Sequence, residues 1–424
     1  MILIQGGRVI DPEKQEERIG DVIIEGGRIR AVGTFPDTGD YEKVIRAFGC
    51  VVAPGLVDIH VHFRDPGFPH KEDIGTGAAA AAAGGYTTVV CMANTKPAVD
   101  NPETLRYVIE EGKKTGIHVL SAAAVTVGLK GHQLTDMKAL REAGAAGFTD
   151  DGIPLMDAGI LSAAMEQAAL LGVPVSLHEE DPGRIKENGI NHGRVSETLG
   201  IYGSPSEAEE TLIARDVKIA LATGAKVNIQ HISTAGGVEQ IRQARKQGAD
   251  VTAEVTPHHF TLTEDAVLKY GTLAKMNPPL RTEKDRQALL EGLRDGTITI
   301  IATDHAPHSR DEKNRPLTQA PSGITGLETS LALGITELVQ RGHLTMVQLI
   351  EKMSLNPARL YGLDCGRMAE GAPADLVIFD PDEEFCPETF YSRADNTPFR
   401  GWKLKGKVRC TICGGRIVYS DRQM

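Results

Sequence analysis

Two histidines at alternate positions are the residues best placed to do chemistry. His60 and His62 follow an apolar run, residues 51–57, which predicts a buried strand. Residues two apart on an extended strand project from the same face, so both imidazoles can point at one spot. Neutral imidazole is the commonest side-chain metal ligand, and a rigid strand suits a catalytic metal. A His-x-His pair also arises by chance as a polar strand end, so the interpretation depends on ligands elsewhere in the chain.

Further candidate ligands follow other apolar runs. They are Asp150-Asp151, His178, His231 and Asp304. Taken singly, each is more often a hydrogen-bonded polar residue than a ligand. Together with the first pair they make four histidines and two carboxylates, a set that suits two divalent ions such as Zn²⁺ with open positions for water.

A two-metal site needs an anion between its cations, and a carboxylate after the fourth run could supply it. Asp150 and Asp151 point to opposite sides if the strand continues, so only one of them can bridge. The alternation does not say which. We choose Asp151 as the bridge and place Asp150 beside the site.

Eight short apolar runs, separated by helical stretches, would have to position these residues. The runs are residues 57–62, 87–92, 117–124, 145–149, 174–178, 226–231, 251–255 and 298–303. This alternation over residues 53–363 predicts an α/β fold, a (β/α)8 TIM-type barrel, in which chemistry takes place at the carboxyl ends of the strands. The candidate ligands all fall at such ends.

Both ends of the chain carry a different pattern, in which apolar runs alternate with paired glycines. Gly6-Gly7, Gly26-Gly27 and Gly414-Gly415 are typical of hairpin turns. Because the ends share this pattern and the middle lacks it, we expect residues 1–52 and 364–424 to form one small β-sandwich domain with a structural role.

Two stretches of the middle region need a separate interpretation. The alanine-rich residues 75–83 predict a buried first helix that packs closely on the barrel. Residues 310–321, rich in charge and proline, fit neither a helix nor a strand, and we interpret them as a candidate lid over the site.

The composition excludes several classes of function. A formal net charge of −11 and the lack of a basic stripe argue against nucleic-acid binding, although a few arginines could still hold an anionic small molecule. No apolar run approaches the roughly 20 residues that span a bilayer, and no signal core is visible, so we expect a cytoplasmic protein without membrane contact. Six cysteines make no disulfide framework, and we interpret Cys410-x-x-Cys413 as strand residues in preference to a zinc site.

Two motifs resemble a known family. The segment Ala302-Thr303-Asp304-His305-Ala306-Pro307-His308, with Lys313 five residues further on, resembles the dihydroorotase signature. The Asp-x-His-x-His-x-Arg pattern at residues 58–64 resembles the same family, within the amidohydrolase superfamily. The resemblance covers nearly the whole chain. It implies two Zn²⁺ ions per subunit, with His60, His62, Asp151, His178, His231 and Asp304 as the ligands.

The fourth run departs from many amidohydrolases, which bridge their metals there with a carbamylated lysine. Residues 147–152 include no lysine, and Lys138 lies in the preceding helical stretch. This departure resembles the bacterial dihydroorotases that use an aspartate bridge. It weakens the match to hydantoinases and dihydropyrimidinases.

The resemblance also implies a set of substrate contacts. Arg64, Asn94 and His308 would hold a substrate carboxylate beside His62, and a guanidinium fork suits that group. The ring of the substrate would meet Asn277 and the backbone of Ser322-Gly323. On their own, the two asparagines are more simply explained as turn formers. The ligand set is full without His258 and His259, which we assign to structure or to support of the ligands.

The activity implied by the resemblance is reversible cyclisation of N-carbamoyl-L-aspartate to L-dihydroorotate, in de novo pyrimidine (UMP) biosynthesis. In ring opening, a hydroxide bridging the metals would attack the ring amide, with Asp304 as proton shuttle. A homodimer and an aspartate transcarbamoylase partner are further expectations from the family alone. The rival interpretations are an allantoinase or hydantoinase, and a non-catalytic scaffold, against which the complete ligand set argues.

Overall fold

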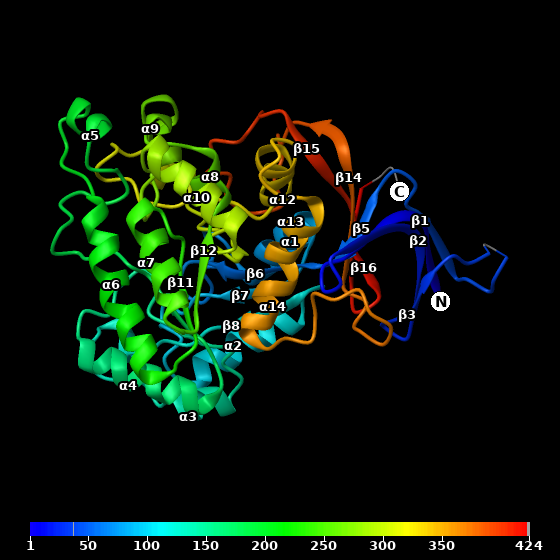
Figure 1. The fold of residues 1–424 in the computed structure, drawn as a ribbon, viewed down its shortest axis with the longest axis horizontal. Helices are drawn as coiled ribbons and strands as arrows, with labels where there is room; N and C mark the ends of the chain where they lie inside the picture. The colour runs from blue at the N-terminus through cyan, green and yellow to red at the C-terminus, as the bar shows by residue number, and fades with distance from the viewer. Residues whose placement is uncertain (37, 422–424) are drawn as a thin grey trace.

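Strands from both ends of the chain pair in one sheet, which lies at the right of Figure 1. The computed structural model describes residues 1–36 and 38–421. The strands of this sheet are β1 (Ile2–Asp11), β2 (Glu16–Glu25), β3 (Arg28–Gly33), β4 (Lys43–Arg46), β5 (Val51–Pro54), β14 (Leu376–Phe385), β15 (Leu404–Cys413) and β16 (Arg416–Ser420). Their order is β16-β15-β14-β5-β1-β2-β3, with β4 paired to β1.

The paired glycines have two different structural roles. Gly26-Gly27 and Gly414-Gly415 form the turns of the β2–β3 and β15–β16 hairpins, as predicted. The prediction of a hairpin was wrong for Gly6-Gly7, which lie inside β1 at a break in its register with β2. An extra residue can be accommodated there because Gly6 adopts a φ of +72°, which glycine tolerates.

The middle of the chain forms the predicted (β/α)8 barrel. Its strands are β6 (Leu56–Val61), β7 (Tyr86–Cys91), β8 (His118–Ser121), β9 (Phe148–Thr149), β10 (Val175–Leu177), β11 (Val227–Ile229), β12 (Val251–Val255) and β13 (Ile300–Ile301). They form two parallel runs, β6-β7-β8 and β13-β12-β11-β10-β9. Parallel bridges from Ala123 to Phe148 and from Val61 to His305 join the two runs at both edges and close the barrel.

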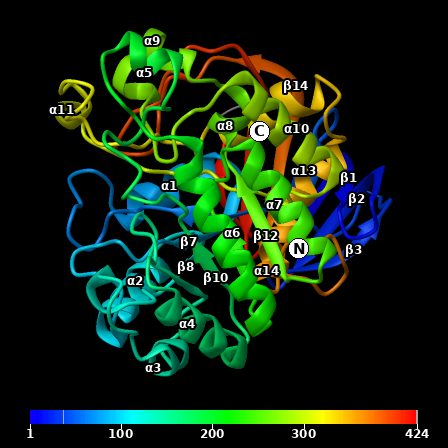
Figure 2. The same cartoon turned by 60° about the vertical axis from the view of Figure 1, so that its left-hand side comes forward.

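Helices surround these strands, as Figures 1 and 2 show from two sides. Those before β12 are α1 (Ile74–Ala83), α2 (Pro102–Lys113), η1 (Val127–Leu129), α3 (Met137–Glu142), α4 (Ala158–Leu171), α5 (Arg194–Thr198), α6 (Ser206–Thr223) and α7 (Ala235–Lys246). Those after β12 are α8 (Pro257–Thr261), α9 (Asp265–Tyr270), η2 (Gly271–Ala274), α10 (Glu283–Asp295), α11 (Arg310–Lys313), α12 (Ser330–Leu333), η3 (Gly334–Val339), α13 (Met346–Ile350), η4 (Glu351–Leu355) and α14 (Asn356–Tyr361). Among residues 1–36 and 38–421, no helix combines the length and the apolar character needed to cross a membrane.

Helix α1 is the predicted alanine-rich helix. It begins at a capping box made by Asp73 and Thr76, and most of its alanines are buried. A Cβ atom on Gly77 would lie 2.4 Å from the ring of Phe63, so the helix approaches the chain after β6 too closely for a larger residue. Small side chains therefore bring α1 against the segment that follows the first barrel strand.

Residues 310–321 contain one helical turn, α11. The prediction that this segment has no regular secondary structure was therefore wrong for Arg310–Lys313. Ser309 caps this turn, since its side chain accepts a hydrogen bond from Glu312 N, and the Glu312 carboxylate in return accepts one from Ser309 N. The rest of the segment is irregular, as predicted.

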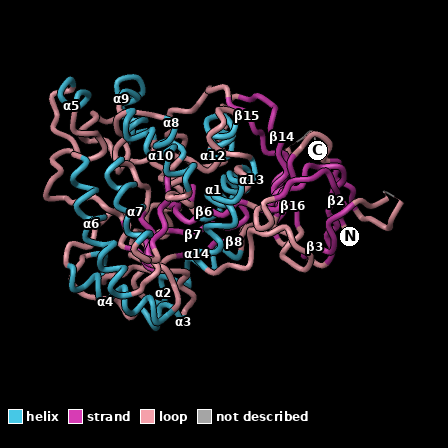
Figure 3. The backbone as a smooth tube through the Cα atoms, in the orientation of Figure 1, coloured by secondary structure: helices cyan, strands magenta, loops and turns pink. Residues whose placement is uncertain are grey.

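The sheet and the barrel are directly connected at β5 and β6, which Figure 3 shows in magenta. Gly55 is the single residue between them. Strand β5 pairs with β1 and with β14, while β6 pairs with β7. The largest apolar cluster includes Val51 of β5 and Phe379 of β14 together with barrel residues, so the core runs across the junction. The domain limits at residues 52 and 364 stay a prediction.

Candidate active site

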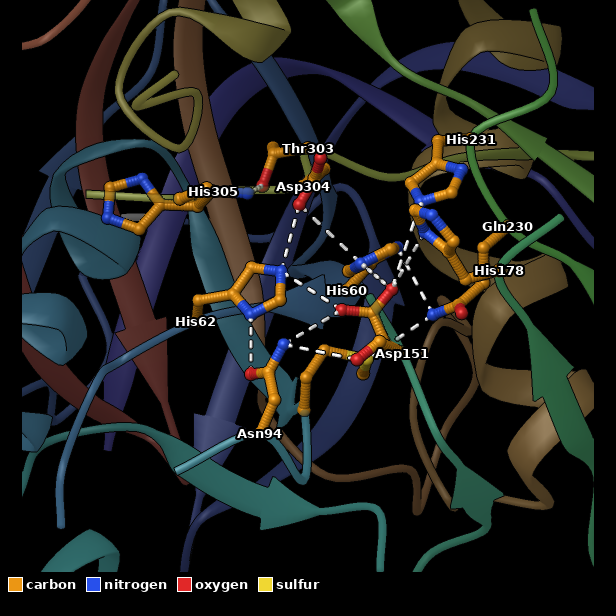
Figure 4. Close-up of polar contacts among 12 residues, drawn as sticks. His60, His62, Asn94, Asp151, His178, Gln230, His231, Thr303, Asp304 and His305 are labelled. Carbon is orange, nitrogen blue, oxygen red and sulfur yellow. Dashed lines mark hydrogen bonds and ion pairs between the residues drawn. The ribbon is translucent and has the colours of Figure 1, made fainter. Parts of the chain in front are cut away.

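The candidate ligands meet at the carboxyl ends of the barrel strands (Figure 4). His60 lies in β6, and the other ligands lie one to three residues beyond the ends of β6, β9, β10, β11 and β13. The predicted runs that ended on His62, His178 and His231 were therefore too long by one or two residues. The backbone leaves the strand geometry at these points, with φ of +32° at His231 and +47° at Asp304. Such left-handed values are strained for residues other than glycine and cluster at functional sites.

Asp151 lies among four imidazoles. Its Oδ1 atom is 3.3 Å from His60 Nε2, 3.7 Å from His178 Nδ1 and 3.8 Å from His231 Nε2. Its Oδ2 atom is 3.4 Å from His62 Nε2. The carboxylate thus faces four imidazole nitrogens, three at Oδ1 and one at Oδ2, as is expected of a group that bridges two cations.

Asp150 takes no part in this cluster. Its Oδ1 atom accepts hydrogen bonds from Val125 N at 2.8 Å and Thr126 N at 3.1 Å, and its Oδ2 atom contacts the Thr126 hydroxyl. It therefore fixes the loop after β8. This geometry favours Asp151 as the bridge, as we chose from the sequence.

Asp304 borders the His60 and His62 side of the cluster. Its Oδ1 atom lies 2.9 Å from His62 Nε2 and 3.5 Å from His60 Nε2. The preceding residue is held by Asp58, whose carboxylate accepts a hydrogen bond from Thr303 N at 3.2 Å. Strand β6 thus positions the segment that carries Asp304.

The donor set fits divalent cations. Three groups of ligand atoms each lie within 4.8 Å of one another: His60, His62 and Asp151; His60, His231 and Asp304; and Asp151, His178 and His231. His60 Nε2 and Asp151 Oδ1 are buried and have no hydrogen-bond partner among the described residues. Leaving such an atom unpaired costs about 1–3 kcal/mol, so cations at these positions would satisfy them.

The carboxylates are held in the ionised form that a cation requires. Burial acts to raise the pKa of Asp151, but the charge of His60 and the nearby imidazoles of His178 and His231 hold that pKa well below its usual range. Burial is likewise outweighed at Asp304, whose pKa is lowered by His60 and His62. Both groups are therefore available as ligands at neutral pH.

Buried carboxylates orient two of the histidines, and sequence reasoning missed them. His60 Nδ1 contacts Glu254, which also accepts a hydrogen bond from Asn228 Nδ2 at 3.0 Å. His178 Nε2 lies 3.2 Å from Glu180 Oε2. Partners of this kind fix the ring so that the other nitrogen faces the metal. A glutamate inside the apolar run of β12 was the available signal for Glu254.

A cavity of about 180 Å³ opens beside the cluster. Its lining includes every predicted substrate contact, namely His62, Arg64, Asn94, Asn277, His308, Ser322 and Gly323, and also Asp151, His178, His231 and Asp304. Asn277 Oδ1 and Ser322 Oγ have no hydrogen-bond partner among the described residues and are free to meet a ligand. Gly323 has a φ of +139°, and a Cβ atom there would lie 2.9 Å from Ala306 O, so only glycine fits this wall.

Asn94 connects the cavity to the cluster. Its Oδ1 atom accepts from His62 Nδ1 at 3.0 Å, and its Nδ2 atom donates to Asp151 Oδ2 at 3.2 Å (Figure 4). These contacts go beyond those of a turn-forming asparagine. His258 and His259 lie outside the cavity lining, and His259 Nε2 donates to Pro278 O at 2.9 Å, which fits a structural role.

Cationic groups surround His308 at the other side of the cavity. Burial, together with Arg64, Lys71 and Lys313, lowers the pKa of His308 to about 2, so its imidazole is neutral. Its Nε2 atom lies 2.8 Å from Ser322 O and therefore carries the proton, which leaves Nδ1 to accept from Lys71 Nζ at 3.4 Å. The neutral ring among cations leaves a positive environment suited to a carboxylate.

Comparisons with known proteins place the chain in a family. A family model described as Dihydro-orotase-like matches residues 49–236. A dihydroorotase of Clostridioides difficile (strain 630) is 59% identical over 420 residues, which cover 99% of this chain and 100% of the relative. A dihydroorotase of Clostridium acetobutylicum is 52% identical over 424 residues, with 100% of both chains covered. The chain belongs to the dihydroorotase family.

The resemblance of the two motifs to the dihydroorotase family is thereby confirmed. Among solved structures, an L-hydantoinase (dihydropyrimidinase) from Arthrobacter aurescens matches with a TM-score of 0.90 at 24% identity, over 99% of this chain and 96% of its own. A D-hydantoinase from Thermus sp. matches with a TM-score of 0.85 at 25% identity, over 99% and 96%. These structures share with the dihydroorotase chain the fold of a barrel joined to a β-sheet.

Proposed function

We propose that the protein is a dihydroorotase, an enzyme that reversibly cyclises N-carbamoyl-L-aspartate to L-dihydroorotate in pyrimidine biosynthesis. The observation that carries this proposal is the composition of one cavity, whose lining combines candidate metal ligands with Arg64, Asn94 and His308. Its volume of about 180 Å³ suits a single small ring. Family membership supports the choice of substrate.

The substrate carboxylate would bind at the cationic side of the cavity. Arg64 has a φ of +60°, and its Nε atom donates to Pro307 O at 3.3 Å, which fixes the guanidinium beside His308. The fork can present two N–H groups to a carboxylate, and Asn94 can add a neutral contact. The amide groups of the ring would then face Asn277 and Ser322, whose polar atoms are otherwise unpaired.

We propose two Zn²⁺ ions per subunit. His60, His62 and Asp151 would hold one ion, with Asp304 beside it, and Asp151, His178 and His231 would hold the other. Bound cations there would lower the pKa of water and polarise the ring carbonyl.

Asp304 is the proposed proton shuttle. Its carboxylate is ionised, lines the cavity and borders the ligand histidines, so it can accept a proton from the attacking water. In ring opening it would pass that proton to the leaving ring nitrogen, and in ring closure it would take the proton back.

The decisive experiment measures hydrolysis of L-dihydroorotate by protein of known metal content, with dihydrouracil as the matched substrate that lacks the carboxylate. We expect turnover of dihydroorotate, its loss on chelation and its return with Zn²⁺. Preference for dihydrouracil would refute the role of Arg64 and favour a hydantoinase. Bound metal without turnover of either compound would contradict the proposed activity.

The family resemblance extends the proposal to the setting of the enzyme. We propose a cytoplasmic homodimer that can associate with an aspartate transcarbamoylase. Light scattering on the purified protein, alone and with the transcarbamoylase, tests both assemblies, and a monomer in both samples would refute them.

A further inference from the structure

A second group of metal-ligand side chains lies at the opposite end of the barrel from the cavity. His118 begins β8, whereas the candidate catalytic residues lie at or beyond the carboxyl ends of their strands. Asp375 directly precedes β14, and Cys413 ends β15. One ligand atom from each of these three residues lies within 4.8 Å of the other two. The group therefore joins a barrel strand to two strands of the terminal sheet.

The three side chains are held in place by their surroundings. Asp375 Oδ2 lies 3.2 Å from His118 Nε2, and Asp375 Oδ1 accepts a hydrogen bond from Gly414 N at 2.7 Å. Cys413 Sγ lies 3.6 Å from Thr87 O. Asp375 and Cys413 are buried, while the His118 side chain is 50% exposed. The group is thus fixed on the protein side and open to water at His118.

The spacing of His118 and Asp375 is close to that of two ligands on one tetrahedral cation. Bonds of about 2.0–2.3 Å to nitrogen, oxygen and sulfur place neighbouring ligand atoms about 3.3–3.8 Å apart. The 3.2 Å separation of His118 and Asp375 is close to this range. Imidazole, carboxylate and thiolate together favour a borderline cation of the Zn²⁺ class over Mg²⁺ or Ca²⁺.

We propose that His118, Asp375 and Cys413 form a structural binding site for a Zn²⁺-class cation, with water at the fourth position. The ion would connect β8 to β14 and β15 and so stabilise the junction of barrel and sheet. The Cys410-x-x-Cys413 pair is not this site, because Cys410 is absent from the group of ligand atoms that the structure brings together among its described residues.

A test for a metal–thiolate bond distinguishes this proposal from a simple ion pair between His118 and Asp375, because the ion pair does not involve Cys413. We would replace the metals of the intact enzyme with Co²⁺, since a thiolate bound to Co²⁺ absorbs in the near ultraviolet and nitrogen and oxygen ligands do not. The candidate catalytic ligands include no cysteine, so the band reports on the new site alone. We expect the band in the unmodified protein, together with one more bound ion per chain than in a His118→Gln variant.

Matched variants make the test specific. The band should disappear in Cys413→Ser and in His118→Gln, and it should persist in Cys410→Ser, which alters a buried cysteine of the same strand, and in Cys386→Ser, which removes an exposed thiol. His118→Gln decides the matter if Cys413→Ser does not fold, because His118 is half exposed. Turnover of dihydroorotate should be retained in His118→Gln, so this proposal and the proposed function can fail separately. Absence of the band in the unmodified protein, its survival in His118→Gln, or its loss in Cys386→Ser would overturn the proposal.

Discussion

Asp304 both contacts the candidate ligand His62 and lines the cavity, which makes it the most informative single residue. In Asp304→Asn the side chain keeps its size but no longer accepts a proton. We expect kcat for L-dihydroorotate to fall by about 10²–10⁴-fold, the usual contribution of general acid–base catalysis, while KM changes little. Steady-state kinetics on samples with matched metal content would measure this. Near-normal turnover would refute the proton-shuttle role.

The neighbouring aspartates Asp150 and Asp151 should differ sharply when each is changed to asparagine. Asp151→Asn removes the charge that faces four imidazoles, so we expect the purified protein to retain fewer metal ions and to lose activity. Asp150→Asn alters a loop contact away from the cluster, so we expect metal content to be retained and stability to fall. Elemental analysis of both variants decides between them. Retention of metal by Asp151→Asn and its loss from Asp150→Asn would reverse the assignment.

At the residue scale, sequence patterns predicted which candidate ligands come together better than they predicted the groups that contact those ligands. Candidate ligands such as His178 and Asp304 follow apolar runs, and strand ends of a parallel barrel converge, so their meeting could be predicted. Glu254 contacts His60, which lies in a distant segment. Glu180 contacts His178, and this contact depends on the direction that the folded backbone gives to both side chains. No spacing in the sequence encodes those contacts. The strained φ of His231 was equally hidden, and it explains why the strand ends earlier than its apolar run.

At the scale of elements, two buried lysines hold the loop that brings Ser322 and Gly323 to the cavity. Lys275 Nζ donates to Leu317 O and Ala320 O, both at 2.8 Å, and Lys313 Nζ donates to Pro321 O and Gly323 O, both at 3.0 Å. A hydrogen bond contributes about 0.5–1.5 kcal/mol, and burial lowers the pKa of both lysines, that of Lys313 to about 7. The segment after α11 is therefore held by four hydrogen bonds from two lysine side chains.

We expect Lys275→Met to loosen this loop and to raise KM for dihydroorotate by roughly tenfold, the effect of losing about 1.4 kcal/mol of binding free energy. Turnover at saturating substrate should change less, because the ligand cluster is untouched. Lys269→Met, on the exposed face of α9, is the matched control and should behave like the unmodified enzyme. An unchanged KM in Lys275→Met would show that the loop keeps its position without this contact.

Glu328, two residues before α12, should make stability depend on pH. Burial raises the pKa of Glu328 to about 7, although its carboxylate accepts hydrogen bonds from Tyr391 N and Ser392 N. A group whose pKa is raised on folding adds stability at pH values below its unfolded pKa, and that contribution is lost as the pH rises through 7.

Between pH 5 and pH 8 the unmodified protein should therefore lose up to about 3 kcal/mol of unfolding free energy relative to Glu328→Gln, which cannot ionise. Urea unfolding of both proteins at the two pH values measures the difference. An equal change in both proteins would mean that Glu328 ionises in the folded state as readily as in water.

The elements themselves were predictable to different degrees. All eight barrel runs contain a strand, because apolar runs between helices report burial. Their lengths were not predictable, since strands such as β9 and β13 are only two residues long and end where the backbone turns toward the site. Gly6-Gly7 shows the converse problem. Two other glycine pairs form hairpin turns, whereas Gly6-Gly7 forms a bulge inside a strand.

At the scale of the whole molecule, the sheet and the barrel share one core. Strand β5 lies between β1 and β14 and continues through Gly55 into β6, and the largest apolar cluster includes residues of both parts. We expect the intact chain to unfold in one calorimetric transition. A chain that ends at residue 363 lacks β14, β15 and β16, so it should fail to give soluble protein with a barrel-like circular dichroism spectrum. Two separate transitions, or a soluble truncated chain, would contradict this view.

The pairing of β5 with β14 also bears on how the protein is made. Synthesis proceeds from the N-terminus, so the strand that carries His60 emerges early, long before residues 376–385 leave the ribosome. Until then one edge of β5 has no partner, although β6 can already pair with β7. The strand next to the one that carries His60 is therefore paired on both edges only after β14 has been released, and we expect metal loading of the candidate site to come late in biosynthesis.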